Sequence, residues 1–190
     1  MSLIFAIASV GGKILSNEKV KEGISLGVDM GIKKLYNYLD KDGDGDVDQD
    51  DVNLISEYAN MLVSIWGQAA AADGVTEECE EEAVCGLIGD VIFGGNEPVF
   101  HLDLLQKFGI KKKELKKSLW EKFENPEPLN LIAKYAEDKE LEDIFYSQAC
   151  AVIYCDKEVN DKERQFLDEF AKALELLNID KKRIEKEYIL

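Results

Sequence analysis

The chain has 190 residues, of which 46% are hydrophobic and 33% are charged, a composition typical of a globular protein and not of a disordered one. Its net charge of −16 repels phosphate backbones and anionic membrane surfaces, which argues against nucleic-acid binding and membrane contact. Divalent cations or basic protein partners are the natural counterparts. The four cysteines match no CxxC spacing and there is one histidine, so we expect free thiols, no zinc site and a cytoplasmic protein.

The N-terminal part begins with an apolar stretch at residues 3–10, which is too short to span a bilayer and lacks the basic start of a signal peptide. We expect it to pack on the body of the protein, with surface anchoring as the alternative. A helix is predicted over residues 18–39, although three glycines weaken it. Its apolar residues recur at helical spacing and stop at Leu39.

Residues 40–51 form an acidic loop in which carboxylates recur at the spacing that a hard, oxygen-seeking cation needs. Gly45 provides backbone freedom for a sharp turn at position 6, and Val47 at position 8 provides an apolar anchor. The expected ligands stand at positions 1, 3, 5, 7, 9 and 12 of the loop: Asp40, Asp42, Asp44, Asp46, Asp48 and Asp51. This stretch resembles the EF-hand calcium loop. The alternative is a solvated acidic linker.

The twelfth position departs from the EF-hand pattern, because Asp51 replaces the usual glutamate that binds through both oxygens. Aspartate is one methylene shorter, so it would bind through one oxygen or pull the following helix inward. Losing one ligand atom weakens the preference for Ca²⁺ over Mg²⁺. We therefore expect a calcium site of moderate or weak affinity for which magnesium competes.

Beyond the loop the chain reads as all-α, because prolines are scarce and strand-like alternation is nearly absent. A long helix from Gln49 to about Ala72 should carry an apolar stripe onto the body. Thr76 should cap a helix that ends before Gly94. Later helices, each expected to bury one stripe, are predicted over residues 98–108, 111–123, 129–136, 138–155, 160–177 and 181–188, with caps at Asn160 and Asp180.

Two segments, residues 66–78 and 149–163, repeat one pattern of a small-residue helix, an aspartate, a turn, a valine and an acidic helix start. We expect the two copies to cross at the centre of one core, related by a pseudo-twofold axis. Together with the Asn125–Pro–Glu–Pro128 break, this repeat resembles the tellurite-resistance TerB-like domain. That resemblance implies a compact helical fold, a link to stress responses and no established enzymatic activity. It also implies metal binding through Asp73 with Glu77 (or Glu78), and through Asp156 with Glu163. The alternative is that these acids only cap helices.

The sequence thus predicts an EF-hand-like helix–loop–helix at residues 1–51, whose exiting helix continues to about residue 72, and a TerB-like domain at residues 52–190. No motif for a nucleophile or a phosphate cradle is present, so we expect no enzyme. The expected function is a Ca²⁺- or Mg²⁺-binding, metal-responsive interaction module. The alternatives are a helical scaffold with a purely structural metal site and, third, a carboxylate-based metal-dependent enzyme.

Overall fold

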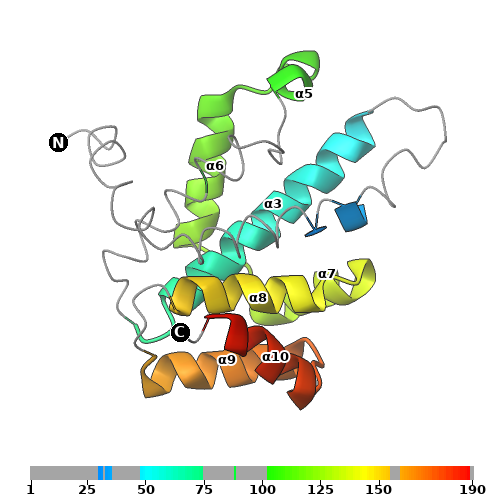
Figure 1. Ribbon diagram of the computed structural model, residues 1–190. Helices are drawn as coiled ribbons and strands as arrows, with labels where there is room; N and C mark the ends of the chain where they lie inside the picture. The colour runs from blue at the N-terminus through cyan, green and yellow to red at the C-terminus, as the bar shows by residue number, and fades with distance from the viewer. Residues whose placement is uncertain are drawn as a thin grey trace.

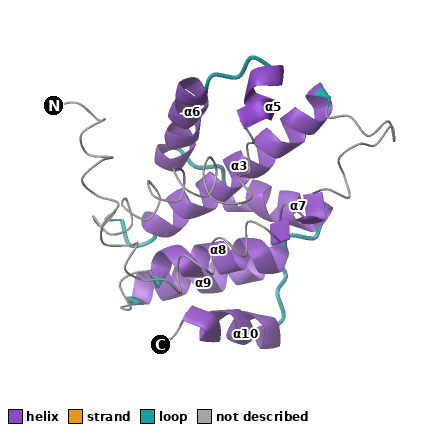
Figure 2. Ribbon diagram, turned by 45° about the horizontal axis from the view of Figure 1, so that its top comes forward, coloured by secondary structure: helices purple, strands orange, loops and turns teal. Residues whose placement is uncertain are grey.

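The computed structural model describes residues 30–31, 33–35, 48–74, 88, 102–154 and 159–188, and every regular element among them is a helix. The labelled helices are α3 (Gln49–Ala70), α5 (Leu102–Lys107), α6 (Lys112–Glu124), α7 (Leu129–Lys139), α8 (Glu142–Ile153), α9 (Asp161–Ala173) and α10 (Asn178–Tyr188). Figure 2 shows only helices and loops in this part of the chain, which confirms the all-α prediction there. Of the helices described, none is both long and apolar enough to cross a bilayer.

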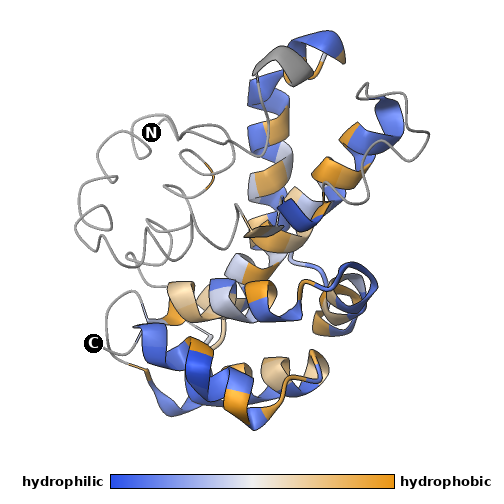
Figure 3. Cartoon of the chain, turned by 45° about the vertical axis from the view of Figure 1, so that its right-hand side comes forward, coloured by the Kyte–Doolittle hydropathy of each residue, from blue (hydrophilic) through white to orange (hydrophobic). Residues whose placement is uncertain are grey.

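Helix α8 lies at the centre of the fold. It packs against α3 on one side and against α9 and α10 on the other, and it also contacts α7 (Figure 1). Helix α3 runs across the molecule and packs in addition against α6 and α7. Figure 3 shows that the outer sides of α9 and α10 are largely hydrophilic, as expected for helices that cover a core.

The expectation that each helix buries one stripe is wrong for α8 and for the second half of α3. Within α8 only Glu142, Asp143 and Ser147 escape full burial. From Tyr58 onward, most residues of α3 are buried as well. The physical reason is the number of neighbours: a helix with partners on several sides has no face left for water, and the small side chains of Ala149 and Ala151 let those partners approach.

Two contacts fix α3 in this core. A Cβ atom at Gly67 would lie 2.3 Å from the carbonyl oxygen of Phe123, so the close approach of α3 to α6 requires glycine at this position. The buried indole Nε1 of Trp66 donates a 3.2 Å hydrogen bond to Oε1 of Gln148 on α8. The two helices of the sequence repeat therefore contact each other in the core, whereas their pseudo-twofold relation stays a prediction.

The predicted helix boundaries are correct for the start of α3 and within one residue for both ends of α6, but four others are wrong: the end of α7, the start of α8, the end of α9 and the start of α10. Helix α7 extends past residue 136, and α8 begins at Glu142 instead of residue 138, because Glu140 adopts a left-handed conformation (φ 57°) that ends α7. Helix α9 ends at Ala173 and not at residue 177, since Glu175 is also left-handed (φ 54°). Asp180 lies inside the first turn of α10 and is not its cap. Apart from residues 30–31, 33–35 and 88, the helices predicted over 18–39 and from Thr76 to Gly94 lie outside the described residues.

Candidate metal centre

The acidic loop leads directly into α3 through a capping box. Asp48 is extended at the N-cap, and its Oδ1 accepts hydrogen bonds from the backbone N–H groups of Asp50 (2.7 Å) and Asp51 (3.0 Å). In return, Oδ2 of Asp51 accepts a 3.1 Å hydrogen bond from the backbone N–H of Asp48. These are positions 9 and 12 of the loop, so the last two expected ligands are held in a defined orientation by the helix that they begin.

The sequence at this helix start is acidic. Residues 48–51 include three aspartates and no basic residue, and the Asp51 side chain is only 6% exposed. A buried carboxylate beside like charges is costly unless hydrogen bonds or a cation offset its charge. The helix dipole and the capping bonds provide part of that compensation. Asp40, Asp42, Asp44 and Asp46, the other four expected ligands, lie outside the described residues.

Residues shortly before the loop also contact the helical body. Leu35 is almost completely buried in the core. A Cβ atom at Gly31 would lie 1.9 Å from the hydroxyl oxygen of Tyr58 on α3, so the backbone there runs directly against the tyrosine. Lys34 Nζ donates a hydrogen bond to the carbonyl oxygen of Glu140 at the end of α7. Sequence reasoning missed these contacts because they join positions far apart along the chain.

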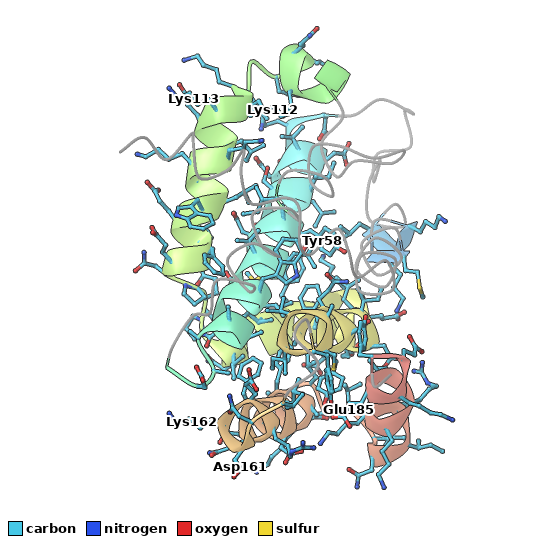
Figure 4. The ribbon with its side chains drawn as sticks, turned by 60° about the vertical axis from the view of Figure 1, so that its left-hand side comes forward. Tyr58, Lys112, Lys113, Asp161, Lys162 and Glu185 are labelled. Atoms are coloured by element: carbon cyan, nitrogen blue, oxygen red, sulfur yellow. The ribbon has the colours of Figure 1, made fainter. Side chains whose placement is uncertain are left out.

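Of the four residues of the second predicted site, the structure describes Asp73 and Glu163. Both carboxylates accept hydrogen bonds from Asn160. Asn160 Nδ2 donates to Oδ2 of Asp73 (3.3 Å), and the Asn160 backbone N–H donates to Oε2 of Glu163 (2.7 Å). Lys162 Nζ, labelled in Figure 4, donates a 2.6 Å hydrogen bond to the carbonyl oxygen of Asp73. The turn after α3 is thereby tied to the start of α9, where Asn160 and Glu163 form the capping box that the sequence predicts.

Within the described ranges, no three His, Cys, Asp or Glu side chains form a group that could hold a metal ion. Glu77 and Asp156, the remaining two candidates of the second site, fall outside those ranges, so metal binding there stays a prediction. The hydrogen bonds around Asn160 account for Asp73 and Glu163 as structural groups. Sequence reasoning identified Asn160 as a cap but missed its bond to Asp73, which no local pattern encodes.

Cys150 on α8 is free and buried, as predicted; the other three cysteines lie outside the described residues. Burial, together with the nearby Glu185 carboxylate, raises the pKa of its thiol well above the ordinary value. Glu185 on α10 accepts a 2.7 Å hydrogen bond from the hydroxyl of Tyr146 on α8. Because the thiolate is the reactive form of cysteine, these surroundings argue against Cys150 as a nucleophile or a metal ligand.

The chain was also compared with protein-family models, with curated proteins and with solved structures, and none of the three comparisons finds a match.

Proposed function

We propose that the chain binds Ca²⁺ through the loop at residues 40–51, that Mg²⁺ competes for this site, and that the protein acts as a metal-responsive interaction or stress-related module. The expected ligands are Asp40, Asp42, Asp44, Asp46, Asp48 and Asp51. The role in interaction or stress rests on the TerB-like repeat. A basic or otherwise complementary protein would be the partner of an acidic module of this kind.

The capping box at the start of α3 is the observation that supports this proposal most directly. It orients the carboxylates at loop positions 9 and 12. Asp51 is nearly buried and stands close in the sequence to Asp48 and Asp50, and a bound cation would offset the charge of these carboxylates. The contact of Gly31 with Tyr58 adds support, because chain segments on both sides of the loop then lie together. Such convergence suits a helix–loop–helix and not a solvated linker.

The proposed binding is tested by calorimetric titration of the full chain with Ca²⁺ and separately with Mg²⁺. We expect a calcium dissociation constant in roughly the micromolar to submillimolar range, raised by millimolar Mg²⁺. The double variant Asp40→Ala/Asp44→Ala should give no binding heat, because it removes two carboxylate ligands. Asp50→Asn is the matched control, since it removes a charge at position 11, which is no ligand position. Unchanged binding in the double variant would contradict the proposed site.

A purely structural metal site is the second candidate function. The position of α3 in the core is what favours it, because a cation at the helix start would stabilise the folded state by mass action. Hydrogen exchange with and without Ca²⁺ separates the two candidates. Changes confined to residues next to the loop favour the structural site, whereas changes that reach other helices favour the responsive module.

A further inference from the structure

Helix α10 packs along one side of α8 and buries few of its own residues. Of its 11 residues, only Ile184 and Tyr188 are buried. The hydroxyl oxygen of Tyr188 lies 2.7 Å from Oγ of Ser147 on α8. Its ring stacks on that of Tyr154, with centroids 6.4 Å apart. The apolar part of this helix contact is therefore small.

Charged side chains provide the rest of the attachment of α10. Figure 4 shows Glu185 on the side of α10 that faces α8 and α9. Three contacts between helices involve a carboxylate: Tyr146 donates to Glu185 (2.7 Å), Arg183 donates to Asp143 (2.6 Å), and Lys181 donates to Asp168 on α9. All three join α10 to another helix, so they do not require that both helices belong to the same chain.

The connection from α9 to α10, residues 174–177, is short and contains a left-handed residue. Glu175 has a φ of 54°. Its N–H donates to the Lys172 carbonyl (3.2 Å), and the N–H of Leu176 donates to the Ala171 carbonyl (3.0 Å). Glycine usually occupies this position at a helix end, because a Cβ atom disfavours the left-handed conformation. A connection that extended would release Glu175 from this conformation.

Two apolar side chains beside this connection face water. Leu177 is 67% exposed and Ile179 is 74% exposed, the largest fractions among the bulky apolar residues that the structure describes. They stand two positions apart at the start of α10. A second connection placed beside the first would cover them, and burial of apolar surface favours association.

We propose that two copies of this chain exchange α10, so that each α10 docks on α8 of the other copy. The contacts between α10 and α8 are all kept, because the docking surface is the same in both copies. The connections differ: each extends, Glu175 leaves the left-handed region, and the two copies of Leu177 and Ile179 meet where the connections cross. Short connections under strain favour such domain swapping. This inference is independent of the proposed metal site.

The first test measures the dimer dissociation constant of the full chain by size-exclusion chromatography with light scattering. The proteins are first equilibrated in mild urea, so that helices can exchange, and we expect a wild-type dimer. Glu175→Gly favours the compact turn and should raise the dissociation constant by about tenfold or more, since each dimer contains two connections. Glu175→Val should lower it by a similar factor, because a β-branched residue resists the left-handed conformation.

Glu140→Gly is the matched control. Glu140 is also left-handed, and its turn has the same pattern of bonds, from Glu140 to Glu137 (3.3 Å) and from Leu141 to Ala136 (2.8 Å). The helix that follows it, α8, is buried on nearly all sides and cannot leave the fold, so this variant should keep the wild-type constant. A wild type that stays monomeric up to about 1 mM overturns the proposal. Equal constants in the wild type and both Glu175 variants also overturn it.

A mixture of two charge-reversal variants separates exchange of α10 from other modes of dimerisation. Arg183→Glu places a glutamate against Asp143, and Asp143→Lys places a lysine against Arg183, so each variant alone contains a repulsive pair. In an exchanged heterodimer each α10 meets α8 of the other variant, and both pairs become attractive. In a dimer without exchange, every chain keeps its own repulsive pair. Native mass spectrometry of an equimolar mixture should therefore show more heterodimer than random pairing gives.

The charge-reversal variants should fold, because Arg183 and Asp143 are both half-exposed. The double variant Asp143→Lys/Arg183→Glu restores an attractive pair within one chain and should dimerise as the wild type does. Heterodimer at the random share, or no dimer in the mixture, overturns the exchange of α10 even if the wild type dimerises.

A last pair of variants tests the apolar contact between the two connections. Leu177→Gln/Ile179→Gln should raise the dissociation constant by about tenfold, because it removes apolar surface that the dimer buries. Leu131→Gln is the control: Leu131 is an exposed apolar residue on α7 and should have no effect. An unchanged constant in the double variant would contradict the meeting of the two connections, on which the proposal depends.

Discussion

The starts of α3 and α9 carry the same capping box but differ in charge. At α9 the N-cap is the neutral Asn160, and residues 160–164 contain two acidic and two basic side chains. At α3 the N-cap is Asp48, and residues 48–51 contain three aspartates with no basic residue. At the start of α9, the acidic and basic side chains are therefore equal in number, and Asn160 is hydrogen-bonded to Asp73. The α3 start has the same cap geometry but only acidic charges in its first residues, a combination to which the proposed cation would add the opposite charge.

The largest expected difference between the two helix starts is their response to calcium. At a calcium concentration about one hundred times the dissociation constant, we expect the free energy of unfolding to rise by about 2.7 kcal/mol in the wild type. Asn160→Ala should retain this increment, whereas Asp48→Ala should lose most of it if the proposed site holds, because one of the proposed ligand side chains is gone. Urea denaturation in Ca²⁺ and in EDTA measures both values. Equal losses in the two variants would mean that the helix starts do not differ in metal binding.

In EDTA, where no calcium contributes, we expect Asn160→Ala to lower the free energy of unfolding more than Asp48→Ala does. Asn160→Ala removes a helix cap and the contact with Asp73, so we expect a loss of about 2 kcal/mol in the free energy of unfolding. Asp48→Ala also removes a cap, but it relieves repulsion from Asp50 and Asp51, so its loss should stay below about 1 kcal/mol. Asp161→Ala, an exposed acid in the same turn of α9, serves as control and should change stability by less than about 0.5 kcal/mol. Equal losses for Asn160→Ala and Asp48→Ala would show that the excess charge at α3 has no energetic consequence.

Alkaline pH provides a perturbation that acts away from both helix starts. The pKa of Cys150 is raised in the folded protein, so stability from its protonated thiol is fully present below the unfolded pKa of about 8.5. As the pH rises above that value, the unfolded chain loses a proton that the folded chain keeps, and stability falls by at most about 1.4 kcal/mol per pH unit. Cys150→Ala should flatten this slope between pH 9 and 10, equally in Ca²⁺ and in EDTA. A slope that depends on calcium would link Cys150 to the metal response.

Short sequence patterns predicted most of the features that involve residues close together in the chain. The start of α3 and the capping box of Asn160 and Glu163 follow from short sequence signatures, because the bonds involved join residues at most three positions apart. The capping box of Asp48 and Asp51 was missed, because these two residues were interpreted only as metal ligands. The turn at Glu140 was missed because a left-handed residue at a helix end is usually glycine or asparagine, and here it is glutamate. Burial of α8 on nearly all sides was missed because it depends on which helices surround it. The Lys34–Glu140 contact spans 106 positions, and no spacing rule reaches that far.

The hydrogen bond between Trp66 and Gln148 has a practical consequence for experiments on this protein. Trp66 is fully buried, and its indole contacts the neighbouring helix through a single identifiable bond. Trp120 is the other tryptophan in the sequence, and it lies partly exposed beside Phe123. Replacing Trp120 with phenylalanine leaves one natural fluorophore at the contact of α3 with α8. The wavelength of its fluorescence emission maximum would then report rearrangements of the protein interior in real time, without any attached dye.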